Sequence, residues 1–513
     1  MTGAGGEGTY RRRVRAWALY DWANHAYVTV TATTFFPPTF VAVAAPAFLA
    51  GGGPARARDT ASNVYAFAAA GALLVVALLA PLLGTIADLT GRRKRLLLAV
   101  TAVGGAAASA MVAITTGRWV LALALYAVSQ VAVNIALGLN SSLLPHVARP
   151  ADTARASALG YAMGYAGGGL LLAVATAAYA GAARLGLARG DVVRLAFLAV
   201  GVWWVAFAVP LAVAVPEPPA RPEDGDARPL LRAALARLGR TLRDLRGHRH
   251  LFTMLVAFWL YMEGVGAIVL LATAYGAALG LPTATLFGTL LLTQFVAFPY
   301  ALAFGRIPDP AVAWRGRALA MVAWSAATLP LLGAFANRRG GLGVATTLAV
   351  IAADQLAGAV FALAAGGLFA AVARRLDVKR TIVVGLAVYA IVPLWGFVLR
   401  TEAEFLMIGV LVGAVQGGTQ ALSRVLYAQM SPRASSGEFF GLYALAEKFA
   451  GILGPLLYGT VGQITHNPRA SILSVAVFFA LGIWVLTRVD VAAGTRAARA
   501  EDAATAVAAG SLP

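Results

Sequence analysis

The sequence predicts an all-α polytopic membrane protein, and three observations support this class. Of its 513 residues, 60% are hydrophobic and only 12% are charged, which is about half the charged share of a soluble globular chain. Apolar runs long enough to cross a bilayer, about 20 residues each, recur along the whole chain. Because backbone groups in lipid must hydrogen-bond within their own segment, we expect these runs to be helices rather than strands.

The apolar runs form two sets separated by a polar stretch. Six runs precede it, at about 17–47, 62–87, 96–115, 119–144, 156–180 and 192–215. Eight runs follow it, at about 251–279, 284–305, 317–336, 344–373, 381–399, 405–424, 438–460 and 470–487. We therefore predict about 14 helices, divided into an N-terminal six-helix bundle over 17–215 and a C-terminal helical bundle over 251–488.

The polar stretch at 216–250 begins with the proline-rich, acidic segment PEPPARPEDGDARP. It continues as LLRAALARLGRTLRDLRGHRH, in which Leu recurs at helical spacing and Arg occupies the other face. A solvated linker is one interpretation. We favour a cytoplasmic linker with an amphipathic helix on the membrane surface, because the two faces differ so clearly in polarity.

The basic residues indicate the orientation of the chain. A net charge of +19 can indicate a nucleic-acid partner, but here Lys and Arg occur in short clusters between apolar runs, which is typical of cytoplasmic loops. With the N-terminus inside, 30 of the 41 basic residues fall in cytoplasmic segments, 10 fall outside, and Lys448 lies within a helix. We expect no nucleic-acid partner, and cytoplasmic tails at 1–16 and 489–513 of a protein of the cell (inner) membrane.

A charged motif, GTIADLTGRRKR at 84–95, follows the second apolar run. Gly84 permits close helix approach, Asp88 can cap or pair near the next helix, and Gly91 permits a tight turn. Together with the basic residues Arg92, Arg93 and Arg95, they can form a charge network that closes one conformation. An ordinary positively charged loop is the alternative. The order of residues strongly resembles the loop signature of the major facilitator superfamily.

Four further segments resemble the vacuole-effluxer-like branch of that superfamily, which includes autophagy-related amino-acid effluxers. They are LYDWANHAYVTVTATTFFPP at 19–38, FWLYMEGVGAI at 258–268, VQGGTQALSRVLYAQMSP at 415–432 and EFFGLYALAEKFAGILGPLLYG at 438–459. In the second segment the branch usually has an Asn-Asp pair, where this chain has Met262 and Glu263. The resemblance implies a two-bundle fold with 12 core helices. The extra helix pair then suggests an inserted hairpin near 317–373. The resemblance also implies a second copy of the loop motif in the C-terminal half. Two segments there keep part of the motif, one at 305–317 and the other at 366–380.

The resemblance also implies that the first, fourth, seventh and tenth core helices line a central pathway. Ionisable and amide side chains are costly in lipid and usually face a cavity or one another. Several polar residues in these helices are spaced three or four positions apart, so that they share a helix face. Our candidates for substrate pathway and coupling are Asp21, Asn24, Gln130, Asn134, Glu263, Gln416, Gln420, Arg424 and Lys448.

Most of these candidates also have a structural explanation. Asp21 can pair with Arg15 near the membrane interface. Arg424 can simply lie at the cytoplasmic end of its helix, where basic residues are common. Gln130 and Asn134 can join helices by hydrogen bonds. Glu263 is harder to explain structurally, because it lies about a dozen residues into an apolar run, and a buried carboxyl group there suits a proton carrier. We expect Lys448 to pair with Glu263 or Asp354.

These observations predict a secondary active transporter that moves a small organic solute by alternating access. The resemblance suggests an amino acid, outward movement and a monomer, and Glu263 suggests protons as the coupling ion. A non-transporting membrane sensor or scaffold on the same fold is the alternative. An intramembrane enzyme is less favoured, because no metal or relay spacing joins the five histidines, His25, His146, His248, His250 and His466. We expect no enzyme activity, cofactor or metal.

Overall fold

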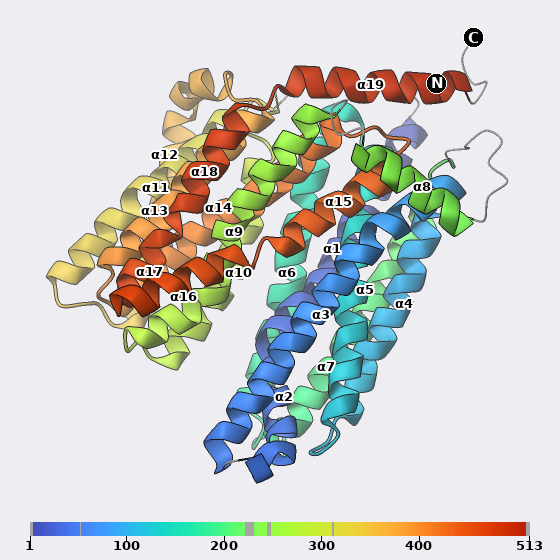
Figure 1. Ribbon diagram of the computed structural model, residues 1–513. Helices are drawn as coiled ribbons and strands as arrows, with labels where there is room; N and C mark the ends of the chain where they lie inside the picture. The colour runs from blue at the N-terminus through green and yellow to red at the C-terminus, as the bar shows by residue number, and fades with distance from the viewer. Residues whose placement is uncertain (1–3, 52, 221–229, 244–247, 310–311, 509–513) are drawn as a thin grey trace.

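The computed structural model describes residues 4–51, 53–220, 230–243, 248–309 and 312–508. Within these ranges the chain is helical and contains no strand, as predicted (Figure 1). Thirteen of the described helices are long and apolar enough to cross a membrane.

The N-terminal half contains seven α-helices. They are α1 (Ala4–Ala26), α2 (Phe36–Ala44), α3 (Gly53–Thr90), α4 (Arg93–Ala110), α5 (Trp119–Val147), α6 (Thr153–Ala180) and α7 (Arg189–Ala214). A π-helical segment, η1 (Tyr27–Phe35), joins α1 to α2, so that the three form one continuous crossing. The segment at 1–16, predicted as a cytoplasmic tail, is helical in its described part, because α1 begins at Ala4.

The C-terminal half begins after the linker helix α8 (Leu230–Arg243), at the place where the sequence predicts an amphipathic helix. Its helices are α9 (Arg249–Ala278), α10 (Thr283–Phe304), α11 (Arg315–Arg338), α12 (Val344–Ala373), α13 (Val378–Val398), α14 (Glu402–Met430), α15 (Ser436–Phe449), α16 (Leu453–Thr465), α17 (Pro468–Ser474) and α18 (Ala476–Thr487). Most of the segment at 489–513, predicted as a cytoplasmic tail, forms the helix α19 (Val491–Ala508).

The run at 438–460 was predicted as one helix, and the structure divides it. Here α15 ends at Phe449 and α16 begins at Leu453, so neither piece is long enough to span a bilayer alone. A buried carboxylate stabilises the break: Glu263 Oε2 on α9 accepts a hydrogen bond from Gly454 N, 2.8 Å away. A negative charge at a helix N-terminus satisfies its free N–H groups and its dipole. This break accounts for 13 spans where the sequence suggested 14.

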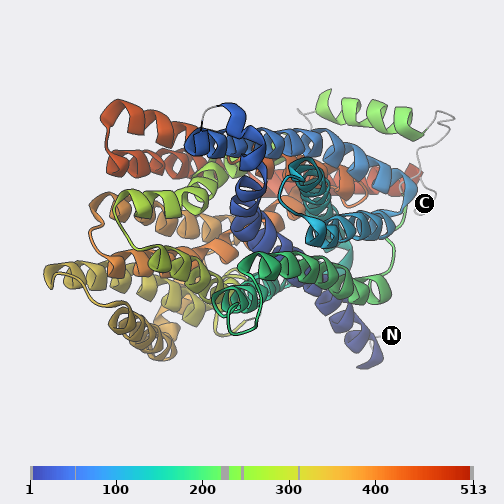
Figure 2. The ribbon, with the colours of Figure 1, turned by 90° about the horizontal axis from the view of Figure 1, so that it is seen from below.

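Buried apolar side chains form two separate cores. One extends from Ala16 to Val215 and the other from Leu251 to Val489. Figure 2 shows the corresponding helices side by side, with the N-terminal half on one side and the C-terminal half on the other. We propose that these cores mark the two bundles expected from the sequence.

The most extensive contacts between the two halves are those of α3 with α15 and of α6 with α10. At one end of the molecule α8 and α19 lie across the other helices (Figure 1). We call this the closed end and the opposite one the open end. The hairpin α11–α12 packs mainly on itself and on α14. Its peripheral place supports our proposal that it is an insertion.

Small residues bring α1 and α6 together, which positions the site between the halves. A Cβ atom on Gly164 would overlap the ring of His25, and one on Gly167 would overlap Trp22. Since the helices approach at glycines, large α1 side chains fit directly against the α6 backbone.

Candidate functional site

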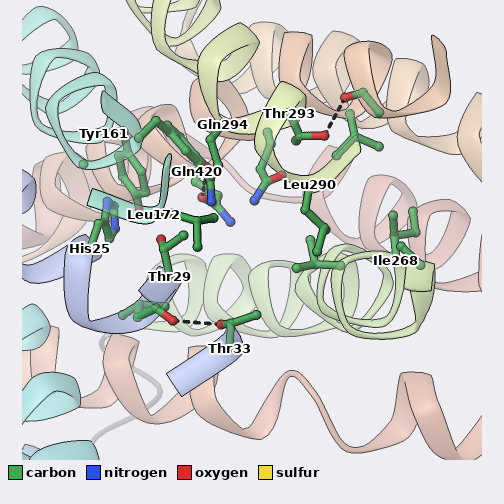
Figure 3. A pocket seen from close by; sticks show the side chains of 18 of the residues that line it. His25, Thr29, Thr33, Tyr161, Leu172, Ile268, Leu290, Thr293, Gln294 and Gln420 are labelled. Carbon is green, nitrogen blue, oxygen red and sulfur yellow. Dashed lines mark hydrogen bonds between the residues drawn. The ribbon is translucent and has the colours of Figure 1, made fainter. Parts of the chain in front are cut away.

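A central cavity of about 290 Å³ lies between the two halves. Its walls come from α1, η1, α5 and α6 on one side and from α9, α10, α14 and α15 on the other. Figure 3 shows side chains from both halves pointing toward this space. Because its two walls belong to different bundles, any rocking of the bundles would change the shape of the cavity.

A buried ion pair forms the floor of this cavity. Both Nη atoms of Arg424, on α14, lie 3.3 Å from Asp21 Oδ2, on α1. Asp21 is 1% exposed and Arg424 is 3% exposed. Asn140 Nδ2 donates to Asp21 Oδ1 at 3.0 Å, and Arg424 Nε donates to Ser157 Oγ at 3.0 Å. These extra hydrogen bonds help to offset the desolvation of the two charges.

Aromatic rings enclose the guanidinium group of Arg424. Its Cζ atom lies 5.0 Å from the ring centre of Trp17 and 4.5 Å from that of Tyr161. A cation near the face of a ring is attracted by the ring quadrupole. Arg424, on α14, is therefore held in place by groups from α1 and α6.

Polar side chains line the cavity above the ion pair. They include His25, Tyr161, Tyr165, Gln294, Gln416, Gln420 and Glu447. The hydroxyl of Tyr165 donates to Gln420 Oε1 at 3.0 Å, which joins the two halves a second time. Figure 3 shows His25 beside Tyr161, with Gln294 and Gln420 at the cavity. The remaining lining is largely aliphatic, including Leu172, Ile268 and Leu290.

The π-helical segment η1 supplies threonines to the same cavity. The hydroxyl of Thr33 donates to the carbonyl of Val28, and that of Thr34 donates to the carbonyl of Thr29, each at 2.8 Å. Such π-helical turns often occur at functional sites. Thr29, Thr33 and Thr34 all line the cavity.

The predicted loop motif joins the halves at the closed end. Asp88 Oδ1 accepts from Gly437 N at 2.9 Å and Asp88 Oδ2 accepts from Glu438 N at 2.8 Å, so the carboxylate sits at the N-terminus of α15. Arg93 Nε lies 2.5 Å from Asp88 Oδ1, and Arg93 Nη2 donates to the carbonyl of Ala434 at 2.9 Å. The buried acid and base of the motif therefore connect α3 and α4 to α15 and the turn before it.

The glycines and the other arginines of the motif have distinct positions. Gly84 lies directly against Gly437, where a Cβ atom would overlap the carbonyl oxygen. Gly91 has a φ of 63°, a left-handed conformation that glycine adopts readily. Arg92 and Arg95 are exposed. Whether this arrangement acts as a gate stays a prediction.

One of the two degraded motif copies also contacts the other half of the molecule. In the segment at 305–317, Gly305 lies against Ala158 of α6, and Asp309 Oδ2 lies 2.6 Å from Arg155 Nε. Residues 310–311 of that segment lie outside the described part of the chain. The other candidate, at 366–380, spans the end of α12 and the beginning of α13. The segment at 305–317 therefore joins the halves where α10 ends and α6 begins, through a glycine contact and an acid–base pair.

The structure brings together four of the predicted pathway residues, Asp21, Gln416, Gln420 and Arg424. Asp21 pairs with Arg424 rather than with Arg15, which is exposed. The Lys448 side chain lies outside the described residues, so its predicted pairing is left open.

The other four predicted residues, Asn24, Gln130, Asn134 and Glu263, do not line the cavity. Asn24 is fully buried, and neither polar atom of its amide has a hydrogen-bond partner within the described ranges. Asn134 Nδ2 donates to the backbone carbonyl of Gln130, one turn earlier on α5, at 2.6 Å. The expectation that Glu263 faces the cavity needs correction, because its carboxylate caps α16. Periodicity placed these residues in apolar helices without showing which face they occupy.

Sequence reasoning missed many polar residues of the cavity, among them His25, Tyr161, Tyr165, Gln294 and Glu447. His25 follows Asp21 by four positions, so the shared helix face was a usable signal. The two tyrosines are also four residues apart. Gln294 and Glu447 gave no comparable signal.

Comparisons with known proteins agree with this architecture. The family described as "Vacuole effluxer Atg22 like" matches residues 9–361 and 344–499. An uncharacterized MFS-type transporter of Bacillus subtilis, YxiO, is 27% identical over 479 residues, which cover 93% of this chain and 94% of the relative. Autophagy-related protein 22 of Kluyveromyces lactis is 31% identical over 133 residues, which cover 24% of this chain and 27% of that protein.

Among solved structures, the proton:xylose symporter XylE superposes with a TM-score of 0.57 at 14% identity, covering 93% of this chain and 95% of that one. This likeness shows the fold alone. The two-bundle major facilitator fold predicted from the sequence is confirmed, and the chain is a multi-pass membrane transporter rather than an enzyme. With a family match along almost its whole length, the chain belongs to the Atg22-like vacuole effluxer family of the major facilitator superfamily.

Proposed function

We propose that this transporter moves an amino acid outward across the cell (inner) membrane, by alternating access and in exchange for protons. One observation carries the proposal: the central cavity lies between the two halves, and its floor is an ion pair with one charge from each half. A solute that binds there contacts both bundles, so that it can favour one arrangement of them over the other.

The closed end would be the cytoplasmic end. Its connections carry the basic clusters of the loop motif, and cytoplasmic loops are enriched in Lys and Arg. The structure then represents the outward-facing arrangement. For inward opening, Asp88 must leave the N-terminus of α15, and Asp21 must separate from Arg424. These two events occur at different depths along the same interface between the halves.

The chemistry of the cavity supports an amino acid as the solute. Arg424 offers a cation for a carboxylate, whereas Asp21 and Glu447 offer carboxylates for an ammonium group. The aliphatic residues farther along the cavity suit an apolar side chain. The description of the family as effluxers supports the outward direction. A small solute with both charges satisfies the charged lining without leaving a buried charge unpaired.

Asp21 is our candidate for the coupling carboxyl group in place of Glu263. Protonation of Asp21 would remove one charge of the inter-bundle pair and weaken the closure of the floor. The ammonium group of the solute would bind the Asp21 carboxylate, so a proton on Asp21 and a bound solute would exclude each other. Competition between the proton and the solute ammonium group for one carboxylate gives the exchange that the proposal requires.

The direct test is pH-driven transport in proteoliposomes. Purified protein should accumulate at least one radiolabelled amino acid against its gradient when an opposing proton gradient is imposed, and a protonophore should abolish this accumulation. A non-transporting sensor would instead bind the solute, as measured by a thermal shift, without any flux.

A further inference from the structure

The linker helix α8 carries a buried charge that the loop motif does not explain. Arg237 is 5% exposed although it belongs to the connection between the two halves. Its Nε atom lies 2.9 Å from Glu438 Oε2, and its Nη2 atom donates to Ser435 Oγ at 3.0 Å. Glu438 is fully buried, and Arg237 is its ion-pair partner in the described part of the chain.

This ion pair connects two parts of the molecule that must separate. The helix α8 packs on α3 of the N-terminal half, whereas Glu438 lies in the first turn of α15 in the C-terminal half. The helices α3 and α15 also meet directly, where Gly84 lies against Gly437. When α3 moves away from α15, either α8 must leave α3 or Arg237 must leave Glu438.

The C-terminal helix α19 holds the same turn from the opposite direction. The carboxylate of Asp502 accepts from the backbone N–H groups of Arg433 and Ala434, each at 3.1 Å. Glu501 accepts from Ser435 Oγ at 3.2 Å and lies 2.9 Å from His248 Nε2. Since α19 packs on α9 and α14, these contacts stay within the C-terminal half. They fix the turn that presents Glu438 to the linker.

We propose that Arg237 is a positioning residue for alternating access, forming with Glu438 a second lock at the closed end in parallel with Asp88. The segment at 431–438, which we call the locking turn, is the common partner of both locks. Asp88, in the N-terminal half, accepts hydrogen bonds from its backbone, and Arg237, in the linker, forms an ion pair with its Glu438. The helix α19 stabilises its conformation through Asp502. A buried acid that loses its base is costly, so the lock favours the closed arrangement. This inference rests on the alternating access described above.

The absence of native cysteine makes a distance measurement direct. One pair of spin labels at Ala151→Cys and Ala492→Cys reports the closed end, and a pair at Thr116→Cys and Gln463→Cys reports the open end. All four positions are exposed. Electron–electron distance distributions are then compared for the parent, Arg237→Ala and Arg232→Ala. The last variant is the matched control, because Arg232 lies on the same helix and is exposed.

Loss of the lock should increase the population with a lengthened distance at the closed end by about tenfold in Arg237→Ala, with shortening at the open end. Arg232→Ala should match the parent. Arg237→Lys, which keeps the charge but loses the second hydrogen bond, should be intermediate and provides a milder variant if Arg237→Ala does not fold. Glu438→Gln should reproduce the shift.

Two negative results have different meanings. If the parent shows two distance populations that respond to pH or solute, but Arg237→Ala, Arg237→Lys and Glu438→Gln all match it, the lock is overturned while alternating access stands. If the parent shows one fixed distance under every condition, alternating access itself fails, and the lock fails with it.

Discussion

Asp21 and Arg424 are 403 positions apart in the sequence, yet their side chains form a buried ion pair at the floor of the central cavity. Each charge comes from a different half of the molecule. Asn140 and Ser157 complete the hydrogen bonding around them. The pair therefore closes the cavity and joins the bundles at the same point, which makes it the centre of the proposed transport cycle.

Neutralising Asp21 should abolish the coupling of transport to protons without abolishing the exchange of solute across the membrane. Asp21→Asn keeps a hydrogen-bond acceptor but cannot take up a proton, so we expect pH-driven accumulation to be lost while solute exchange persists. The unpaired Arg424 should lower the free energy of unfolding by about 3 kcal/mol, measured by chemical denaturation in detergent. If Asp21→Asn still accumulates solute in response to a proton gradient, Asp21 is not the coupling group.

Adding a methyl group at Gly84 should weaken the closed end. Gly84→Ala places a Cβ atom against the carbonyl of Gly437, so that α3 and α15 must move apart. We expect labelling of a cysteine placed at Ala434 by a membrane-impermeant maleimide to become several-fold faster in inside-out vesicles. Gly71→Ala is the control on the same helix, because its Cβ atom would meet nothing within 4 Å. Equal labelling of both variants would contradict the prediction.

Glu263 should behave as a structural cap. Glu263→Gln retains a carbonyl oxygen for Gly454 N but loses the charge at the N-terminus of α16, so we expect destabilisation of about 1 kcal/mol. The pH profile of transport should stay that of the parent. A flattened pH profile in Glu263→Gln would instead support Glu263 as the proton carrier.

The hydroxyl of Tyr165 should matter for solute affinity. Tyr165→Phe removes the hydrogen bond that orients Gln420 across the cavity, and one such bond contributes about 1 kcal/mol. We expect KM to rise about fivefold with little change in stability. Tyr389→Phe is the control, since Tyr389 is buried and its hydroxyl has no partner among the described residues. An unchanged KM in Tyr165→Phe would remove this contact from the binding site.

The sequence predicted the fold well because lipid imposes a simple rule on the backbone. Apolar length located every crossing, and the loop motif located the charged cluster of Asp88 and Arg93, although not its contact with α15. The helix break after Phe449 was missed, because the run remains apolar across it. The break is stabilised by Glu263, which lies on another helix and caps the N-terminus of α16. The residues around the break give no signal of a cap that comes from a distant part of the sequence.

The site was predicted less completely for a similar reason. Spacing shows which residues share a helix face, but it does not show which face meets the cavity. Asn134 and Gln420 are both amides in apolar helices, yet Asn134 folds back onto its own helix while Gln420 faces the opposite half. The partner of Asp21 also required the structure, because Arg15 was nearer in the sequence than Arg424.

Counterflow in proteoliposomes tests the central claim most directly. Vesicles are loaded with one unlabelled amino acid, diluted into a trace of the same labelled amino acid, and sampled over time without any proton gradient. We predict that at least one amino acid gives a transient accumulation of label, and that Arg424→Ala abolishes it. A panel of all amino acids that gives no accumulation, from protein that is folded and correctly reconstituted, would contradict the account.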